Sequence, residues 1–391
     1  MSRVLFVAEM GSGFGHVRRL LPLAKAAAAR GQQPTFLVSN PDEVAPLLHD
    51  AGFELRSAPT IGARHRLPVL GRAVAHTFAD ILGTAGFDDA RSLAAATRAW
   101  DDLVSDLRPV AAVCELSPLL CLSAYAGQLP LLVTGYGFVL PPPELPQFPP
   151  LSRAQPQHAE AMLLDNVRAV LRARGRPVPD TLPALLAGDA HFVTGLDELD
   201  PYRELRSQAA VGPPGIEPGP VSRGAREEVF AYLLGDAPAT LSVLTALART
   251  GARGRVFVRR GTHEHRQAVT GGGLTWLERP GEMRRMLQGA RLVVHHGSML
   301  TAEETLLGGR AQLVVPLYLE HLLTARALVA LGAARVLAAG SPPELMGDTI
   351  AAMRQDTSLA RAAESFCARA ADAGRSRTHA GRDRAALLNP R

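Results

Sequence analysis

The sequence predicts an α/β protein built from two doubly wound halves, each with a parallel sheet, and three observations lead to this class. An apolar strand near the start is followed by a glycine-rich loop, an amphipathic helix and a second strand. A stretch rich in proline and glycine interrupts the chain at 211–219. Strands and helices then alternate again, and 391 residues that are 47% hydrophobic suffice for two cores.

In the first half, residues 4–8 are apolar throughout, which is typical of a strand covered on both faces. Apolar side chains recur at helical spacing over 17–30, and Gly31 is suited to end that helix. The uncharged stretch 116–143 is broken by prolines and glycines, so it predicts a buried helix, a turn and a strand and no membrane span. Further strands are expected at 34–39, 110–114 and 131–134.

The second half repeats this alternation, with a helix at 238–250. We expect its strands at 229–234, 255–258, 274–277, 292–295, 312–315 and 335–337. The expected domains are residues 1–210 and 225–373, with a linker at 211–224 and a tail at 374–391. The polar, arginine-rich tail predicts either a helix that packs back on the first half or a frayed end.

Charge and cysteine content narrow the classes of partner. The net charge is 42 − 37 = +5 without a long basic run, which argues against a nucleic-acid partner. Lys25 is the one lysine beside 41 arginines (42 − 1), a bias that we attribute to genome composition and a bacterial source. Three cysteines without a C-x-x-C pair support neither a disulfide framework nor a zinc site. Together with the absence of a signal-peptide pattern, this predicts a cytoplasmic protein without an integral membrane segment, and peripheral membrane contact stays open.

The segment 296–321 is expected to carry the binding chemistry. His296 and Gly297 follow a buried strand, where parallel sheets bind ligands. Ser298 to Thr301 would form the first turn of the next helix, whose free amides and hydroxyl groups favour a phosphate. This pattern suits a nucleoside diphosphate.

Three further side chains of this region suit a ligand rich in hydroxyl groups. Glu304 lies one turn further along the predicted helix and would accept hydrogen bonds from a ribose diol. Glu320 and His321 fall just past the following strand, again at the ligand-binding edge. Gly235 and Asp236 end the strand 229–234 at the same edge. The nucleotide would therefore carry a polar group such as a sugar.

The spacing of His296, Glu304, Gly309, Pro316 and the pair Glu320–His321 is similar to the donor-binding signature of UDP-glycosyltransferase-like, inverting enzymes of the GT-B fold. The resemblance implies two Rossmann-like domains facing across a cleft. By that resemblance, His296 contacts the donor diphosphate, Glu304 the ribose, and Glu320 with His321 the sugar. The likeness extends over the chain, because residues 211–213 (VGP) resemble the motif before the interdomain linker and residues 13–23 the first loop of the family.

Four departures from the signature are visible. Ser298 replaces a glycine, and Glu320–His321 replaces an Asp-Gln pair, so the sugar cannot be carried over. Asp236 stands where a serine is frequent near the phosphates, and we expect an uncompensated carboxylate there to repel them. Trp276 is close to the tryptophan that holds the base, but Gly281 occupies the place of its glutamine partner, which leaves UDP and dTDP both open as donor nucleotides.

The resemblance also implies the catalytic residues. His16 lies in the first loop, where the family has its catalytic base, and Glu115 follows the strand 110–114 in the place of the partner aspartate. A carboxylate on the far imidazole nitrogen would fix the tautomer and stabilise the imidazolium. On the acceptor side we place Gly13, Gly15 and Arg18, although a solvated or ion-paired arginine is the plainer interpretation of Arg18.

Other functions remain to be weighed against an inverting glycosyltransferase that needs neither a metal nor a cofactor. The alternatives are a catalytically silent nucleotide-sugar-binding partner protein, a nucleotide-sugar epimerase and, more distantly, a nicotinamide-dependent oxidoreductase. His263-Glu264-His265 lacks a third ligand nearby, so a solvated loop is favoured over a metal site. The acceptor would be a small molecule, lipid or glycan, and the composition of 61–89 and 140–153 favours an apolar or amphipathic one.

Overall fold

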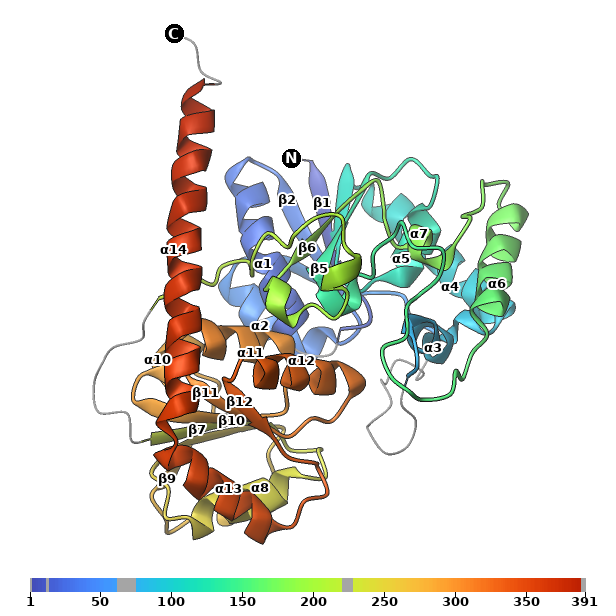
Figure 1. Cartoon of the computed structure of the whole chain (residues 1–391). Helices are drawn as coiled ribbons and strands as arrows, with labels where there is room; N and C mark the ends of the chain where they lie inside the picture. Colours follow the sequence, from blue (N-terminus) through green and yellow to red (C-terminus); the bar gives the residue numbers. More distant parts are fainter. Residues whose placement is uncertain (1, 12–13, 62–74, 220–227, 388–391) are drawn as a thin grey trace. The chain divides into compact units, whose positions relative to one another are not determined.

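The computed structural model describes residues 2–11, 14–61, 75–219 and 228–387, with side chains as far as residue 373. The chain divides into two compact units, Met1–Gly215 and Ile216–Arg391. The division falls inside the segment 211–224, where a linker is expected. Each unit contains one six-stranded parallel sheet with helices packed on it (Figure 1), so the predicted fold class is confirmed.

The sheet of the first unit has the strand order β3-β2-β1-β4-β5-β6, and every described ladder in it is parallel. Its strands are β1 (Arg3–Ala8), β2 (Gln33–Val38), β3 (Glu54–Ser57), β4 (Ala111–Cys114), β5 (Leu131–Tyr136) and β6 (Ala190–Thr194). Its α-helices are α1 (Phe14–Ala29), α2 (Pro41–Asp50), α3 (Phe78–Leu82), α4 (Ala90–Leu107), α5 (Pro118–Ala124), α6 (Glu160–Ala173) and α7 (Leu182–Leu185). A π-helical turn, Gly83–Phe87, continues α3, and 3-10 turns occur at Gly137–Val139, Asp197–Leu199 and Arg203–Leu205.

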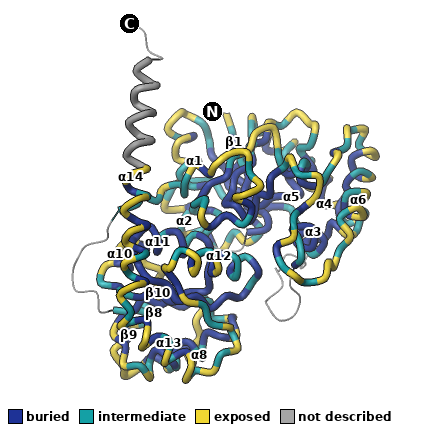
Figure 2. The backbone as a smooth tube through the Cα atoms, in the orientation of Figure 1, coloured by how far each residue is buried: buried dark blue, intermediate teal, exposed yellow. Residues whose placement is uncertain are grey.

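Amphipathic spacing places α1 on this sheet. Val17, Leu20 and Ala24 recur at helical spacing and are buried in a core cluster with Phe6 of β1 and Phe36 of β2. The two phenylalanine rings stack with centroids 5.5 Å apart. Figure 2 shows the resulting pattern, in which the strands are buried and the outer helix faces are exposed.

The second unit repeats the arrangement, with the order β12-β11-β10-β7-β8-β9. Its strands are β7 (Glu228–Leu234), β8 (Gly254–Arg259), β9 (Leu274–Trp276), β10 (Ala290–His295), β11 (Ala311–Val314) and β12 (Ala334–Val336). Its helices are α8 (Thr240–Arg249), α9 (His263–Gln267), α10 (Met283–Leu287), α11 (Met299–Leu307), α12 (Leu319–Ala330), α13 (Pro343–Gln355) and α14 (Thr357–Leu387). Their apolar faces enclose two core clusters, one of which contains Val294 and Leu313 from the centre of the sheet.

Both sheets have the strand order 3-2-1-4-5-6 when the strands of each unit are counted from its own start. In such a sheet the direction of winding reverses between the first and fourth strands, and ligands bind outside the carboxyl ends of the strands at that point. The reversal lies between β1 and β4 in the first unit and between β7 and β10 in the second. The topology therefore selects the residues that follow these four strands.

Every strand expected from the sequence has a counterpart in the structure, and the uncharged stretch forms α5 and β5 as predicted. Two edge strands were not predicted, because β3 (ELRS) contains no buried residue and β6 (AHFVT) is exposed over its first two residues. Helix α1 begins at Phe14, three residues before the expected start at Val17. The tail is helical as far as Leu387, and residues 62–74 of the expected acceptor loop lie outside the described residues.

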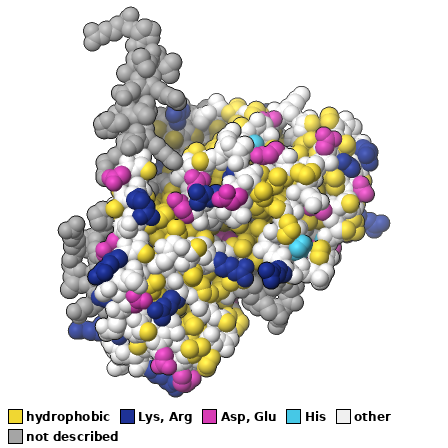
Figure 3. Space-filling model, viewed as in Figure 1, with side chains coloured by type: hydrophobic (Ala, Val, Ile, Leu, Met, Phe, Trp, Pro, Cys, Tyr) yellow, Lys and Arg dark blue, Asp and Glu magenta, His cyan; other side chains and the backbone are white. Residues whose placement is uncertain are grey.

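Two surface properties bear on the expected partners. No helix in the described part of the chain is both long enough and apolar enough to cross a membrane. On the face shown in Figure 3, acidic and basic side chains are interspersed with hydrophobic ones rather than gathered into one basic surface.

Candidate functional site

The two predicted catalytic residues meet in the first unit. Strands β1 and β4 are neighbours, with Val7 opposite Cys114, so the residues after both strands emerge at the same edge. Nδ1 of His16, in the first turn of α1, lies 3.4 Å from Oε1 of Glu115. The Glu115 side chain is fully buried, whereas that of His16 is 14% exposed. The sheet thus brings a buried carboxylate to an accessible imidazole 99 residues away (115 − 16).

Gly11 makes room for the imidazole of His16. A Cβ atom at Gly11 would lie 2.3 Å from Cδ2 and 3.0 Å from Cβ of His16, far inside van der Waals contact. The ring of Tyr136, at the end of β5, lies with its centroid 6.1 Å from that of His16. The orientation of His16 therefore depends on Gly11, which the sequence marked only as part of the glycine-rich loop.

The turn after β4 fixes the carboxylate of Glu115. Its backbone N–H donates to the carbonyl of Val7 at 2.8 Å, which extends the pairing of β4 with β1 by one residue. Leu116 then adopts a left-handed conformation with φ +47°, which costs a non-glycine residue about 1–2 kcal/mol. Its carbonyl accepts from the Met10 N–H at 3.2 Å. This strained turn sends the chain into α5 immediately after Glu115.

Glu9 is a second buried carboxyl group at the same edge, and it was not predicted as a site residue. Its carboxyl oxygens accept from the amides of Leu119 at 2.8 Å and Leu120 at 3.1 Å, in the first turn of α5. Burial raises its pKa to about 8, although both amide hydrogen bonds oppose the shift. Glu9 thereby ties the end of β1 to α5. An acidic residue directly after an apolar strand is the sequence signal that marks it.

Of the three residues expected on the acceptor side, the structure describes two. Gly15 and Arg18 lie on α1 and are half-buried, while Gly13 falls outside the described residues. A Cβ at Gly15 would have no atom within 4 Å, so no close approach requires a glycine there. The neighbouring Arg19 is buried, and its guanidinium lies 4.9 Å from the ring centroid of Tyr136. The roles of Gly13, Gly15 and Arg18 stay predictions.

In the second unit, His296 follows β10 at the point where the winding reverses. Its Nδ1 donates to the carbonyl of Val315 at 2.9 Å, and its Nε2 lies 3.4 Å from Oγ1 of Thr240, the first residue of α8. His296 is 4% exposed, and burial lowers its pKa to about 4. The side chain is therefore neutral near pH 7, with its proton on Nδ1 and its Nε2 lone pair directed towards the α8 start.

The side chain of His295 holds the loop that carries His296. Gly297 has φ +96°, and its N–H donates to Nδ1 of His295 at 3.0 Å. Nε2 of His295 bonds to Oε1 of Gln312 at 2.8 Å, and the Gln312 amide donates to the Ala302 carbonyl of α11 at 3.2 Å. Burial lowers the pKa of His295 to about 4, which keeps Nδ1 free to accept. Sequence reasoning gave His295 no direct role, because nothing local marks its distant partner Gln312.

Helix α11 begins at Met299, so Ser298 precedes the helix and does not belong to its first turn as expected. The hydroxyl of Ser298 donates to Oγ1 of Thr301 at 3.1 Å, which places both hydroxyl groups at the start of α11. Glu304 lies one turn further along and is half-buried. The free amides and two hydroxyl groups at this helix start can bind an anion.

Glu320 and His321 lie in the first turn of α12, directly after the loop that follows β11. Nδ1 of His321 accepts from the Leu317 N–H at 3.5 Å, and its ring packs edge-on against Tyr318. Burial lowers the pKa of His321 to about 3. A Cβ at Gly297 would lie 2.9 Å from the His321 carbonyl, so this turn packs directly on the loop of His296.

The structure shows what compensates Asp236. An uncompensated carboxylate was expected to repel phosphates here, and Oδ2 of Asp236 lies 2.7 Å from Nη2 of Arg260, the residue after β8. Gly235 has a packing role of its own, because a Cβ there would lie 2.2 Å from the Arg260 carbonyl. Sequence reasoning missed Arg260, which lies on a different strand–loop junction from the signature.

The segment of His263 and His265 forms the short helix α9. Nδ1 of His265 accepts from the N–H of Thr262 at 3.1 Å, which makes this histidine part of a capping box. The described residues contain no group of three His, Cys, Asp or Glu side chains placed to hold a metal ion. His265 therefore has a capping role, while His263 and Glu264 are exposed in the first turn of a short helix where a loop was expected.

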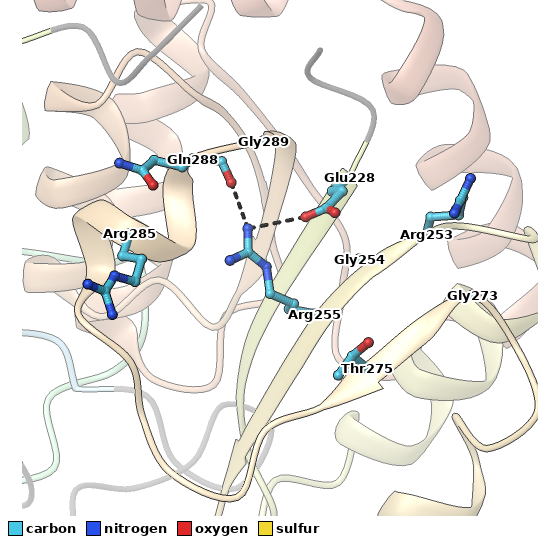
Figure 4. Close-up of a pocket in the computed structure, with 9 residues that line it drawn as sticks. All are labelled: Glu228, Arg253, Gly254, Arg255, Gly273, Thr275, Arg285, Gln288 and Gly289. Atoms are coloured by element: carbon cyan, nitrogen blue, oxygen red, sulfur yellow. Dashed lines mark hydrogen bonds and ion pairs between the residues drawn. The ribbon is translucent and has the colours of Figure 1, made fainter. Parts of the chain in front are cut away.

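A cavity of about 530 Å³ lies elsewhere in the second unit (Figure 4). It is lined by the first residues of β8, by Glu228 of β7 and by Arg285 of α10, at the amino edge of the sheet. Arg255 in this cavity is bound to Glu228 at 3.1 Å and to the Gln288 carbonyl at 2.6 Å. None of the predicted site residues lines it, so it is separate from the carboxyl edge of the sheet.

Comparisons with known proteins decide the fold. The glycosyltransferase VinC in complex with dTDP superposes with a TM-score of 0.65, at 16% identity over 95% of both chains. The spinosyn rhamnosyltransferase SpnG with thymidine diphosphate gives 0.62, at 20% identity over 95% of this chain and 96% of that one. SsfS6, a glycosyltransferase of Streptomyces sp. SF2575, gives 0.59, at 18% identity over 95% and 96%.

The chain has the GT-B fold. No protein-family model and no curated protein sequence matches it. At 16–20% identity the structural likeness establishes the GT-B architecture, while the chemistry has to be argued from the residues themselves. In this GT-B chain those residues form two groups, His16 with Glu115 in the first unit and the loops around His296 in the second.

Proposed function

We propose that the protein is an inverting glycosyltransferase that moves a sugar from a nucleoside diphosphate, UDP or dTDP, to a hydroxyl group of an acceptor. The observation that carries the proposal is the contact of 3.4 Å between His16 and the fully buried Glu115. A histidine–carboxylate pair at the winding reversal of a GT-B fold is suited to remove a proton from a hydroxyl group.

His16 is the general base in this proposal. Its Nε2 takes the proton of the acceptor hydroxyl as the oxygen attacks the anomeric carbon, and the nucleoside diphosphate leaves from the opposite face. Glu115 binds the other ring nitrogen, so it selects the tautomer that presents a free Nε2 and stabilises the imidazolium that forms. General base catalysis of this kind contributes about 10²- to 10⁴-fold to a rate.

The second unit binds the donor in this proposal. The amides at the start of α11 and the hydroxyl groups of Ser298 and Thr301 receive the diphosphate, and Glu304 receives the ribose. Glu320 and His321, in the first turn of α12, face the donor sugar. VinC and SpnG have been crystallised with thymidine diphosphate, which supports dTDP-sugars as first candidates. Neither a metal ion nor a cofactor is needed for any of these steps.

The acceptor in this proposal is a hydroxyl-bearing molecule with apolar parts. Phe78 of α3 and Phe148 of the proline-rich loop pack together at 5.4 Å, and Phe138, two residues after Tyr136, lies 6.3 Å from Phe78. All three rings are buried, so they belong to the core of this unit and do not themselves form a surface for the acceptor. SpnG has been crystallised with the spinosyn aglycone, which supports a small-molecule acceptor.

A transfer assay tests the proposal. The purified chain is incubated with UDP- and dTDP-sugars and a library of hydroxyl-bearing acceptors, and the anomeric configuration of each product is determined by NMR. We expect a product of inverted configuration, and His16→Ala should slow its formation by about 10²- to 10⁴-fold while leaving dTDP affinity within twofold. A retained configuration, an epimerised donor without acceptor, or full activity of His16→Ala would contradict the proposal.

A further inference from the structure

An acidic and a basic side chain lie beside His296 at the ends of β7 and β8. Asp236 and Arg260 are joined by a contact of 2.7 Å. The negative charge of Asp236 favours a higher pKa for His296, against the larger effect of burial. Asp236 raises the pKa of Tyr318 and Arg260 lowers it. The pair therefore belongs to the same edge of the sheet as the loops of His296 and Tyr318.

The backbone holds this pair in a costly conformation. The N–H of Gly235 donates to the Arg259 carbonyl at 2.8 Å, and the close approach of Gly235 to the Arg260 carbonyl leaves no room for a Cβ. Arg260 itself has φ +55°, a left-handed conformation that a glycine would adopt without cost. Arg260 thus occupies a conformation that favours glycine, and non-glycine residues in such conformations collect at functional sites.

The charge balance of the site indicates that Arg260 is needed to offset a bound diphosphate. A diphosphate ester carries about two negative charges, and the helix start of α11 offsets only about half a charge. His295, His296 and His321 are buried with pKa values lowered to about 4, 4 and 3, so they add no positive charge near pH 7. The Arg260 side chain is 53% exposed, and its planar guanidinium fork matches phosphate oxygens.

We propose that Arg260 binds the diphosphate of the donor and that Asp236 positions its guanidinium for this contact. One edge of the fork stays on the Asp236 carboxylate, and the remaining N–H groups bind phosphate oxygens. This inference rests on the proposed function, because it identifies the cation that the donor site uses. It also explains why an aspartate is tolerated beside the phosphates.

Calorimetric titration of the full chain tests this assignment, with dTDP, UDP, the nucleoside monophosphates, thymidine and uridine as ligands. A charge-assisted hydrogen bond is stronger than a neutral one, and partial exposure weakens it, so Arg260→Ala should weaken diphosphate binding about tenfold. Thymidine and uridine affinity should change less than twofold. Arg260→Lys, which keeps the charge without the fork, should give an intermediate affinity.

A matched control is the ion pair of Arg249 with Glu344, which has a similar length of 2.5 Å and similar exposure. Arg249 ends α8 before β8 begins, at the amino edge of the sheet, so Arg249→Ala should not change diphosphate affinity. If the unaltered chain binds diphosphates and Arg260→Ala binds them equally well, the inference is wrong while the proposed function stands. An equal loss for nucleosides and diphosphates also overturns it. A chain that binds no nucleotide at all overturns both.

Discussion

Replacing Gly11 by alanine should disable His16 without changing either of the two side chains proposed as catalytic. The added Cβ would lie 2.3 Å from Cδ2 of His16, whereas carbon atoms in contact stay about 3.5–4.0 Å apart. Relief of this overlap requires a shift of the ring by more than about 1 Å. The contact of 3.4 Å between His16 and Glu115 is already long for a hydrogen bond, so a shift of that size separates the two groups.

The expected loss follows from that displacement. Misplacing a catalytic group by about 1 Å costs about 10²-fold in rate, and complete loss of general base catalysis costs at most about 10⁴-fold. We therefore expect Gly11→Ala to lower the transfer rate at saturating donor by about 10²-fold. The affinity for dTDP should stay within twofold, because the residues proposed to bind the donor belong to the second unit. The assay measures transfer to any acceptor that the unaltered chain uses.

A double-mutant cycle with His16→Ala separates this mechanism from general damage to the fold. If Gly11→Ala acts only through His16, it should lower the rate no further in a His16→Ala background. The melting temperature of each variant shows whether the first unit remains folded. Unchanged activity of Gly11→Ala would refute the steric argument, and an equal loss in both backgrounds would show that His16 is not the group affected.

Three further outcomes are expected. Glu115→Gln should lower the transfer rate by about 10²- to 10³-fold with little change in donor affinity, because the amide cannot stabilise the imidazolium. The rate of Glu115→Asp measures how much activity a shorter carboxylate retains. The pKa values of His295, His296 and His321 lie below their unfolded value of 6.5, so stability present above pH 6.5 should fall by about 1.4 kcal/mol per pH unit for each histidine as the pH drops towards 4. Urea unfolding of the second unit at pH 7.5 and 5 measures this loss, and a midpoint that does not move would contradict buried neutral histidines. Gly297→Ala places a Cβ 2.9 Å from the His321 carbonyl at φ +96°, so dTDP affinity should fall at least tenfold by titration calorimetry.

Local pattern was sufficient for the architecture of this chain. Apolar runs such as Val4 to Ala8, followed by glycine loops and amphipathic helices, report burial and periodicity directly, and these properties do not depend on distant residues. The edge strands were not predicted because they lack such an apolar run. The strand Glu54–Ser57 lies at the edge of the sheet, where it pairs with β2 alone, and it contains no apolar run. Its own residues therefore give no pattern from which this pairing could be predicted.

The spacing from His296 to His321 also lies within one short segment, and it was enough to predict a nucleotide site at the carboxyl edge of the second sheet. What each side chain does there was decided by tertiary contacts. His16 meets Glu115 only because β1 and β4 are neighbours in the sheet, although 99 residues separate the two side chains. Asp236 is compensated only because β8 runs beside β7 and delivers Arg260.

Protonation and packing likewise depend on the folded surroundings. Whether an imidazole is charged depends on how much water it loses and on which atoms face its two nitrogens. The partner of His295 is Gln312 in β11, and that of His296 is Val315, the residue after β11. The need for glycine at Gly11 depends on a ring five positions later that turns back over it. The sequence alone thus determined which residues could act, and the three-dimensional contacts decided which of them meet, because Coulomb and steric forces act through space and not along the chain.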